Sequence, residues 1–171
     1  MAGLNHSGMH THPDIIFITP STPKQLNATR AIFIEYAAQL GVDLCFQNFD
    51  AELQNLPGDY AAPQGALILA MADGDVAGCC ALRPLPSADH IDAAEMKRLY
   101  VRTTYRRLGL GRQLAELVLE AARVAGYHSV LLDTLDDMES ARALYAELGF
   151  VDIPPYYHNP LGGAHYLKVV L

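Results

Sequence analysis

Apolar and polar positions follow one another along the chain in blocks that predict the element order β-α-α-β-β-β-α-β-α-β-β. Strands are expected at 14–19, 65–71, 76–82, 91–101, 129–133, 150–153 and 165–171. Helices are expected at 23–40, 46–56 and 109–126, with a last one opened by Asp136 and Glu139 and closed by Gly149. A hairpin-rich first half followed by a strand–helix–strand unit indicates an α/β protein. Its mixed sheet should carry helices on both faces.

Local signals fix several of these boundaries. Thr22, Pro23 and Gln25 form a capping box with proline at the first helical position, and Gly41 follows the last apolar residue of that helix. Asp73-Gly74 lies between two apolar runs, which is a strong signal for a β-hairpin. The first long helix and the first hairpin are therefore predicted with defined ends.

The length of 171 residues suits one domain, and no linker or internal repeat divides the chain. We expect that domain at 14–171, with a disordered tail at 1–13. Since the tail has no apolar run of signal-peptide length and no segment is long enough to span a bilayer, the expected location is the cytoplasm without membrane contact. His6, His10 and His12 could catch a metal, but a plain tail is the simpler interpretation and no metal is expected.

The net charge of the chain and the distribution of its basic residues limit the classes of ligand that it could bind. The net charge of −7 argues against nucleic-acid binding. Half of all lysines and arginines nevertheless fall between 97 and 112. One basic cluster in an acidic chain predicts an anionic ligand of limited size.

The segment 100–112 shows how such a ligand could be held. Arg106, Gly109 and Gly111 fit an [R/Q]xxGx[G/A] spacing that runs directly into a helix. Two glycines allow the backbone to approach a bulky anion, and the free amides at the helix start favour phosphate. The spacing predicts a pyrophosphate site. A plain turn and a dinucleotide fingerprint remain as alternatives; Leu114 at the third glycine position disfavours the latter, although Asp133 stands where a ribose-binding acid would belong.

Three motifs in order carry a family resemblance. EMKRLYV at 95–101, RRLGLG at 106–111 and ARALYAELGF at 141–150 resemble the successive motifs of the GNAT superfamily of N-acetyltransferases. The order of strands and helices from about residue 14 to 171 is also similar to that fold. The resemblance implies a mostly antiparallel sheet of about seven strands and acetyl-CoA as the acetyl donor.

The same resemblance implies residue roles. Backbone groups of Leu99, Tyr100 and Val101 would pair with the pantetheine arm and polarise the thioester carbonyl. The pyrophosphate would be held by Arg106, Arg107, Leu108, Gly109, Leu110, Gly111 and Arg112. Tyr145 matches the tyrosine that protonates the departing thiolate. Many members carry asparagine seven residues earlier, where this chain has Met138.

Acetyl transfer to an amine also requires a base, because an amine attacks a thioester only when it is neutral. Glu95, upstream of the cofactor-pairing residues, is the candidate; the alternative is a structural ion pair with Lys97 or an arginine. No nucleophile–base spacing suggests a covalent acyl-enzyme, so direct transfer in a ternary complex is expected.

Acceptor contacts are expected from the variable segments. Glu35 could attract a cationic amine, Arg83 a carboxylate, and Tyr156 could supply an aromatic wall. The predicted acceptor is a small-molecule amine, which an acidic group together with Arg83 would narrow to an amino acid or similar zwitterion. A non-catalytic acyl-CoA-binding module is the alternative function, and the resemblance leaves a homodimer open.

Overall fold

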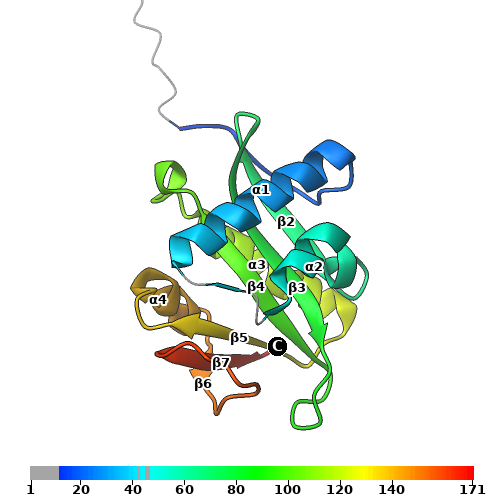
Figure 1. The fold of residues 1–171 in the computed structure, drawn as a ribbon, viewed down its shortest axis with the longest axis vertical. Helices are drawn as coiled ribbons and strands as arrows, with labels where there is room; N and C mark the ends of the chain where they lie inside the picture. The colour runs from blue at the N-terminus through cyan, green and yellow to red at the C-terminus, as the bar shows by residue number, and fades with distance from the viewer. Residues whose placement is uncertain (1–11, 42, 45–46) are drawn as a thin grey trace, which may run out of the picture.

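The computed structural model describes residues 12–41, 43–44 and 47–171. These residues form a seven-stranded open sheet in the order β1-β2-β3-β4-β5-β7-β6, with helices on both faces (Figure 1). The strands are β1 (Ile15–Ile18), β2 (Ala66–Ala72), β3 (Asp75–Leu85), β4 (Ala93–Val101), β5 (Ser129–Leu135), β6 (Val151–Asp152) and β7 (Ala164–Val170). The β4–β5 pair is parallel and every other neighbouring pair is antiparallel, which confirms the predicted mixed, mostly antiparallel sheet.

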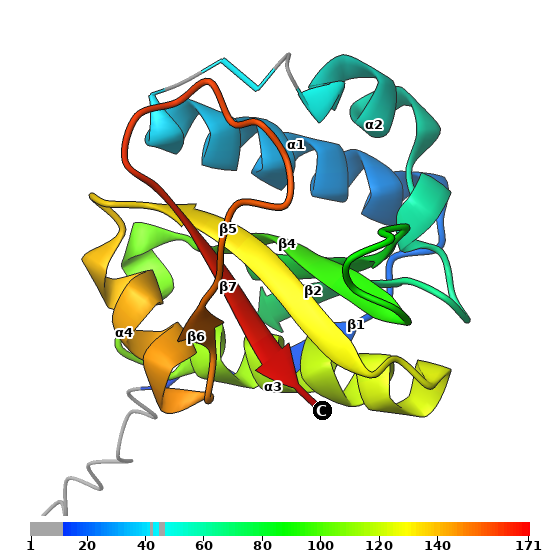
Figure 2. The ribbon, with the colours of Figure 1, turned by 90° about the horizontal axis from the view of Figure 1, so that it is seen from below.

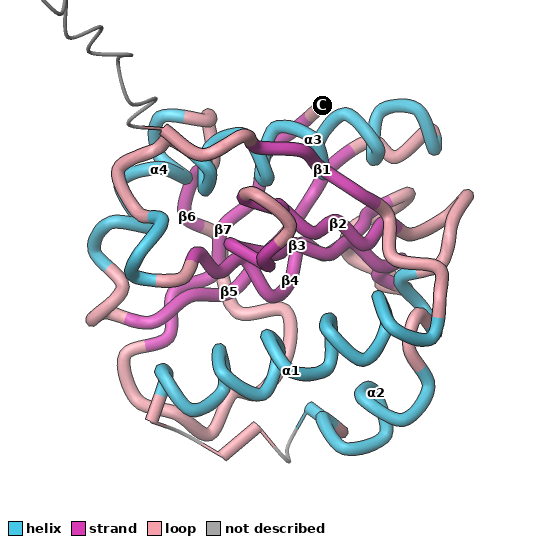
Figure 3. The backbone as a smooth tube through the Cα atoms, turned by 90° about the horizontal axis from the view of Figure 1, so that it is seen from above, coloured by secondary structure: helices cyan, strands magenta, loops and turns pink. Residues whose placement is uncertain are grey.

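Two helices cover each face of the sheet. Helices α1 (Pro23–Leu40) and α2 (Phe49–Asn55) lie on one side, and α3 (Leu110–Ala125) and α4 (Glu139–Glu147) lie on the other (Figures 2 and 3). Short 3-10 turns at Gly58–Tyr60 and Thr103–Tyr105 complete the described elements. The sheet therefore has a separate apolar core on each face.

The predicted caps of α1 are confirmed. The Thr22 hydroxyl accepts a hydrogen bond from the Gln25 amide, the Gln25 side chain accepts from the Thr22 amide, and Gly41 ends the helix in the left-handed region. Helix α3 has the most pronounced apolar face of the described helices. Leu114, Val118 and Ala122 form that face and are completely buried against the sheet. That packing fixes the start of α3 relative to β4.

Some expected boundaries were wrong by a few residues. The second helix begins at Phe49 rather than 46, with Asn48 in the left-handed region before it, and the strand expected at 150–153 spans only Val151–Asp152. The strand expected at 129–133 runs on to Leu135. The tail predicted at 1–13, with His6 and His10, and position 46 lie largely outside the described residues.

Candidate functional site

The parallel pair β4–β5 separates after the first three residues of each strand. Pairing runs only from Ala93 opposite Ser129 to Glu95 opposite Leu131, while both strands continue well beyond that point. From Met96 onward, β4 therefore has no strand partner on its β5 side. Both strands, α4, the end of α1 and the loop after β6 line a cavity at this separation. Its lining residues are Tyr36, Leu40, Leu44, Gln47, Met96, Lys97, Arg98, Leu99, Asp133, Thr134, Leu135, Met138, Tyr145, Asn159 and Leu161.

A β-bulge in β4 shapes one wall of this cavity. Ala81 faces Lys97 and Cys79 faces Tyr100, so a single residue of β3 opposes two of β4, Arg98 and Leu99. Arg98 adopts the left-handed conformation with φ of 63°, which is unusual for a residue with a side chain. The bulge shifts the alternation of β4 by one residue.

Buried contacts of the Arg98 guanidinium hold the bulge. Its Nε and Nη2 each donate to Glu52 at 2.9 Å, and Nη1 donates to Gln47 at 2.9 Å. The guanidinium also lies over the Phe49 ring at 5.2 Å. The Arg98 side chain is 2% exposed, so a buried ion pair holds α2 against the bulge.

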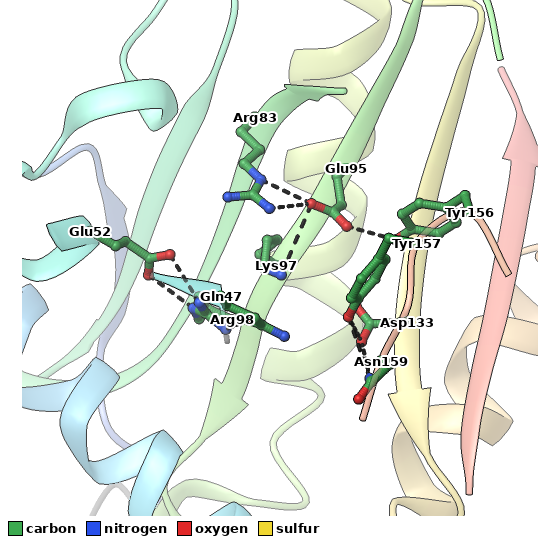
Figure 4. Close-up of polar contacts among 10 residues, drawn as sticks. All are labelled: Gln47, Glu52, Arg83, Glu95, Lys97, Arg98, Asp133, Tyr156, Tyr157 and Asn159. Carbon is green, nitrogen blue, oxygen red and sulfur yellow. Dashed lines mark hydrogen bonds and ion pairs between the residues drawn. The ribbon is translucent and has the colours of Figure 1, made fainter. Parts of the chain in front are cut away.

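Glu95 anchors a second buried cluster. Its Oε1 accepts from Arg83 Nε and lies 2.8 Å from Arg83 Nη2, and its Oε2 accepts from the Tyr156 hydroxyl at 2.6 Å (Figure 4). Burial alone would raise the pKa of Glu95, but Lys97, Arg83 and the Tyr156 hydrogen bond outweigh it and lower that pKa. Glu95 is therefore a carboxylate at neutral pH.

Lys97 lies beside this cluster and lines the cavity. Its Nζ is 4.0 Å from Glu95 Oε1, beyond hydrogen-bonding distance, and its side chain is 4% exposed. Burial lowers the pKa of Lys97, and the neighbouring Glu95 counters part of that effect.

Asp133 brings the carboxylate of β5 to the same cavity. Its Oδ2 accepts from the Tyr157 hydroxyl at 2.6 Å and from Asn159 Nδ2 at 3.2 Å. Tyr157 in turn packs in a cluster of three tyrosine rings with Tyr156 and Tyr166. The loop after β6 thus supplies partners to both carboxylates, Glu95 and Asp133 (Figure 4).

Tyr145 reaches the cavity from α4. It is 6% exposed and packs edge-on against Phe150, with ring centroids 5.6 Å apart. Burial raises the pKa of Tyr145 well above its ordinary value. The phenol therefore keeps its proton at physiological pH and is available as a proton donor.

The glycine loop leads into the start of α3, as predicted. Gly109 has φ of +74° and is the N-cap, and a Cβ at this position would meet no atom within 4 Å. The first-turn amides of a helix have no intrahelical acceptors and suit an anion, and the absence of a side chain at Gly109 lets a bulky group approach the backbone there. A Cβ at Gly111 would make only ordinary contacts, with Leu144 and Val101. The residues present fit a pyrophosphate group.

The arginines of this loop differ in their present contacts. Arg106 Nε donates to the Val101 carbonyl at 3.1 Å, and Arg107 takes φ of 72°. Arg112 pairs with Glu147 and, at 3.4 Å, with Glu116. All of these side chains are at least partly accessible to solvent, so an anion can compete for them.

The structure brings two groups of the predicted site residues together. Glu95, Arg83 and Tyr156 form one cluster, and Leu99 and Tyr145 line the cavity. The ion pair with an arginine that was the alternative to a basic role for Glu95 is present. Glu35 lies apart: it pairs with Arg102 at 3.0 Å and does not line the cavity.

Three residues of the cavity were missed from the sequence. Lys97 had no predicted site role, and Asp133 was considered only for a dinucleotide. Asn159, 26 residues from Asp133, was not considered as its partner. The spacing of Glu95 and Lys97 on one strand was the available signal for Lys97. Nothing in the sequence pairs Asp133 with the loop after β6.

Two findings concern other ligand classes. Within the described part of the chain, no group of three or more His, Cys, Asp or Glu side chains is arranged to hold a metal ion. The same residues include no helix long and apolar enough to cross a membrane.

Comparison with known proteins agrees with the geometry. The model of the Acetyltransferase (GNAT) family matches residues 30–150. An uncharacterised N-acetyltransferase of Schizosaccharomyces pombe is 38% identical over 148 residues, which cover 86% of this chain and 89% of that protein. An uncharacterised N-acetyltransferase of Escherichia coli is 30% identical over 131 residues, covering 77% of each chain.

Solved structures share the fold. A GNAT-family acetyltransferase from Staphylococcus aureus superposes with a TM-score of 0.74 at 20% identity, covering 91% of this chain and 98% of that one. An acetyltransferase from Salmonella typhimurium, solved with its cofactor acetyl-CoA, gives a TM-score of 0.70 at 17% identity over 91% of this chain and 93% of that one. By the family match and the similarity of its relatives, the chain belongs to the GNAT family of acetyltransferases and is an acetyl-CoA-dependent N-acetyltransferase.

Proposed function

We propose that the protein transfers the acetyl group directly to the amine of a small molecule, with donor and acceptor bound together. The observation that carries this proposal is the cavity at the β4–β5 separation, which Lys97, Asp133 and Tyr145 line from three elements. The cavity adjoins the unpaired part of β4, so donor and acceptor can meet there. A homodimer and a cytoplasmic location stay predictions from the sequence.

Backbone groups of Leu99, Tyr100 and Val101 would hold the pantetheine arm, because β5 leaves that side of β4 unpaired. The segment from Arg106 to Arg112 would hold the pyrophosphate. When bound, acetyl-CoA supplies the acetyl group as an activated thioester. These residues fix its position.

Tyr145 is proposed as the proton donor to the departing sulfur. Its raised pKa keeps the phenol protonated, and Tyr145 lines the same cavity as Leu99 of β4. General acid assistance of this kind contributes about 10²- to 10⁴-fold to a rate.

Glu95 is proposed to receive the amine's proton through water. The lowered pKa keeps Glu95 ionised but makes it a weak base, and its hydrogen bonds to Arg83 and Tyr156 restrict its approach to the acceptor. Its contribution should therefore be modest, about tenfold, which is below the roughly 10²- to 10⁴-fold typical of general acid–base catalysis.

The name of one relative suggests an amino acid as the acceptor class. Human N-acetylaspartate synthetase is 32% identical over 105 residues, which cover 61% of this chain and 34% of that protein, and its name specifies an acetylated amino acid. Tyr156 would form an aromatic wall. Of the three residues predicted to contact the acceptor, Arg83 and Tyr156 are those joined to Glu95.

A thiol-release assay with acetyl-CoA and a panel of small amines tests this function. Acceptor-dependent release of free CoA, with the acetylated amine identified by mass spectrometry, is expected. Binding of acetyl-CoA without release for any amine would instead indicate a module that only holds acyl-CoA.

A further inference from the structure

One of the charged side chains that line the cavity is already neutralised by a close ion pair. Among the described residues, its charged lining consists of Lys97, Arg98 and Asp133. Arg98 is neutralised by the bidentate pair with Glu52 behind the wall. One cation and one anion, Lys97 and Asp133, remain facing the cavity.

Lys97 is not neutralised in the same way. Its ion-pair partner among the described residues, Glu95, serves two cations, and Glu95 Oε1 already takes two nitrogens of Arg83. Within the same residues, the Lys97 ammonium makes no hydrogen bond to a carboxylate, since Glu95 Oε1 lies 4.0 Å away. The Lys97 side chain is 4% exposed, and among the described residues no carboxylate oxygen lies within hydrogen-bonding distance of its ammonium, so a ligand carboxylate in the cavity can bind it directly. The cluster of Glu95, Arg83 and Lys97 carries a net positive charge at the cavity wall.

Asp133 is oriented but incompletely bonded. Tyr157 and Asn159 both donate to Oδ2, and in the described part of the chain no hydrogen bond reaches Oδ1. Lys97 and Asp133 form no ion pair with each other, and Figure 4 shows them on neighbouring strands, β4 and β5. Each charged group is therefore available to a ligand that bridges them.

From this arrangement we infer that the acceptor is an amino acid with a free carboxylate, bound by the Lys97 ammonium through its carboxylate and by Asp133 through its amino group. The inference rests on the proposed function and names the acceptor class of the same cavity. It transfers the carboxylate-binding role from Arg83, whose Nε and Nη2 are engaged by Glu95, to Lys97. A zwitterion matches a cavity with one charge of each sign, whereas a simple amine would leave the lysine uncompensated.

Matched acceptors test the inference on the unmodified protein. Each of the twenty amino acids is compared with its carboxamide and with the amine lacking the carboxyl group, by thiol release at saturating acetyl-CoA. At least one amino acid should react with a kcat/KM about tenfold or more above both analogues, the loss typical of a buried charge left unpaired. Equal or faster reaction of the carboxylate-free amines overturns the inference, as does a panel in which no amino acid reacts.

Two variants test which cavity charge binds which group of the acceptor. Lys97→Met, which keeps an unbranched side chain one atom shorter, should reduce the preference for acid over carboxamide to about twofold or less, because the charge that distinguishes them is gone. Asp133→Asn should raise the KM for the amino acid while leaving acetyl-CoA affinity unchanged. Lys24→Met, at an exposed position of α1, serves as the control and should retain wild-type discrimination. Undiminished discrimination in Lys97→Met contradicts the assignment.

Failure of this inference and failure of the proposed function give different results. Titration with acetyl-CoA alone reports the donor site independently of the acceptor. Donor binding with release only for carboxylate-free amines defeats the acceptor class and keeps the function; absence of both donor binding and release defeats the function.

Discussion

Arg83 gives two of its guanidinium nitrogens to a single oxygen of Glu95, with Nε at 2.9 Å and Nη2 at 2.8 Å. The two residues face each other across β3 and β4, and the Glu95 side chain is only 2% exposed. The second oxygen of Glu95 accepts from Tyr156, 61 residues away. This carboxylate therefore links the central strands to the loop after β6, and it does so with both oxygens occupied.

The cluster should respond unequally to removal of its two members. Glu95→Gln leaves both Arg83 and Lys97 without a counter-charge, and we expect it to lower the free energy of unfolding by about 3 kcal/mol, as for other broken buried pairs. Arg83→Met leaves Glu95 with Lys97 and Tyr156, so it should cost less. Urea unfolding of both variants and the double variant measures the coupling; equal costs would contradict the shared role of Glu95.

The same carboxylate predicts a pH dependence of stability. Since folding lowers the pKa of Glu95 below its ordinary value of 4.5, its ionised form stabilises the fold above that pH. The contribution is lost as pH falls through the lower, folded-state pKa. The stability difference between wild type and Glu95→Gln should be constant above about pH 5.5 and shrink below pH 4.5. A difference that grows on acidification would show the opposite sign of shift.

Tyr145→Phe tests the proton donor. We expect kcat to fall about 100-fold, with the KM for acetyl-CoA changed by no more than about twofold, because the hydroxyl acts only as the thiolate leaves. The phenyl ring keeps its packing on Phe150, so stability should be nearly unchanged.

Tyr127→Phe provides the matched control for that variant. It removes a hydroxyl that donates to the Gln64 carbonyl, outside the cavity lining. Its kcat should equal that of the wild type. A Tyr145→Phe variant as active as this control would leave Tyr145 with a packing role alone.

The Arg98–Glu52 pair is predicted to be structural. Glu52→Gln should lower the free energy of unfolding by about 3–5 kcal/mol, since it strands a buried guanidinium in a left-handed bulge. Glu120→Gln, which breaks an exposed pair with Arg123, should cost at most about 0.5 kcal/mol. Similar losses for the two variants, measured by urea unfolding, would mean that the buried pair contributes little.

The helices and strands were predictable because their determinants are local, whereas the mostly antiparallel arrangement of about seven strands was implied by the family resemblance. The capping box at Thr22, the Asp73-Gly74 turn and the apolar stripe of α3 each identify an element without knowledge of the rest. The bulge at Arg98 was not predictable. It depends on bonds to Glu52 and Gln47, 46 and 51 residues away, which hold a side-chain-bearing residue in a conformation that its own sequence does not favour.

The site, like the fold, has parts that the sequence predicts and parts that it does not. The glycine loop is recognisable by its spacing, since two glycines before a helix start have a physical reason to be there. The partners of Asp133 are not recognisable in the sequence. Tyr157 and Asn159 reach it from a loop that the sequence identifies only by its prolines and tyrosines. A pattern along the chain shows which residues share an element, but not which loop closes over a strand end.

Calorimetric titration of the purified protein with acetyl-CoA, and separately with NADH, tests the donor site most directly. We predict saturable binding of one acetyl-CoA per chain in the micromolar range and no response to NADH. Absence of acetyl-CoA binding would mean that the loop from Arg106 to Arg112 is only a turn, and the assignment of the donor site would be contradicted.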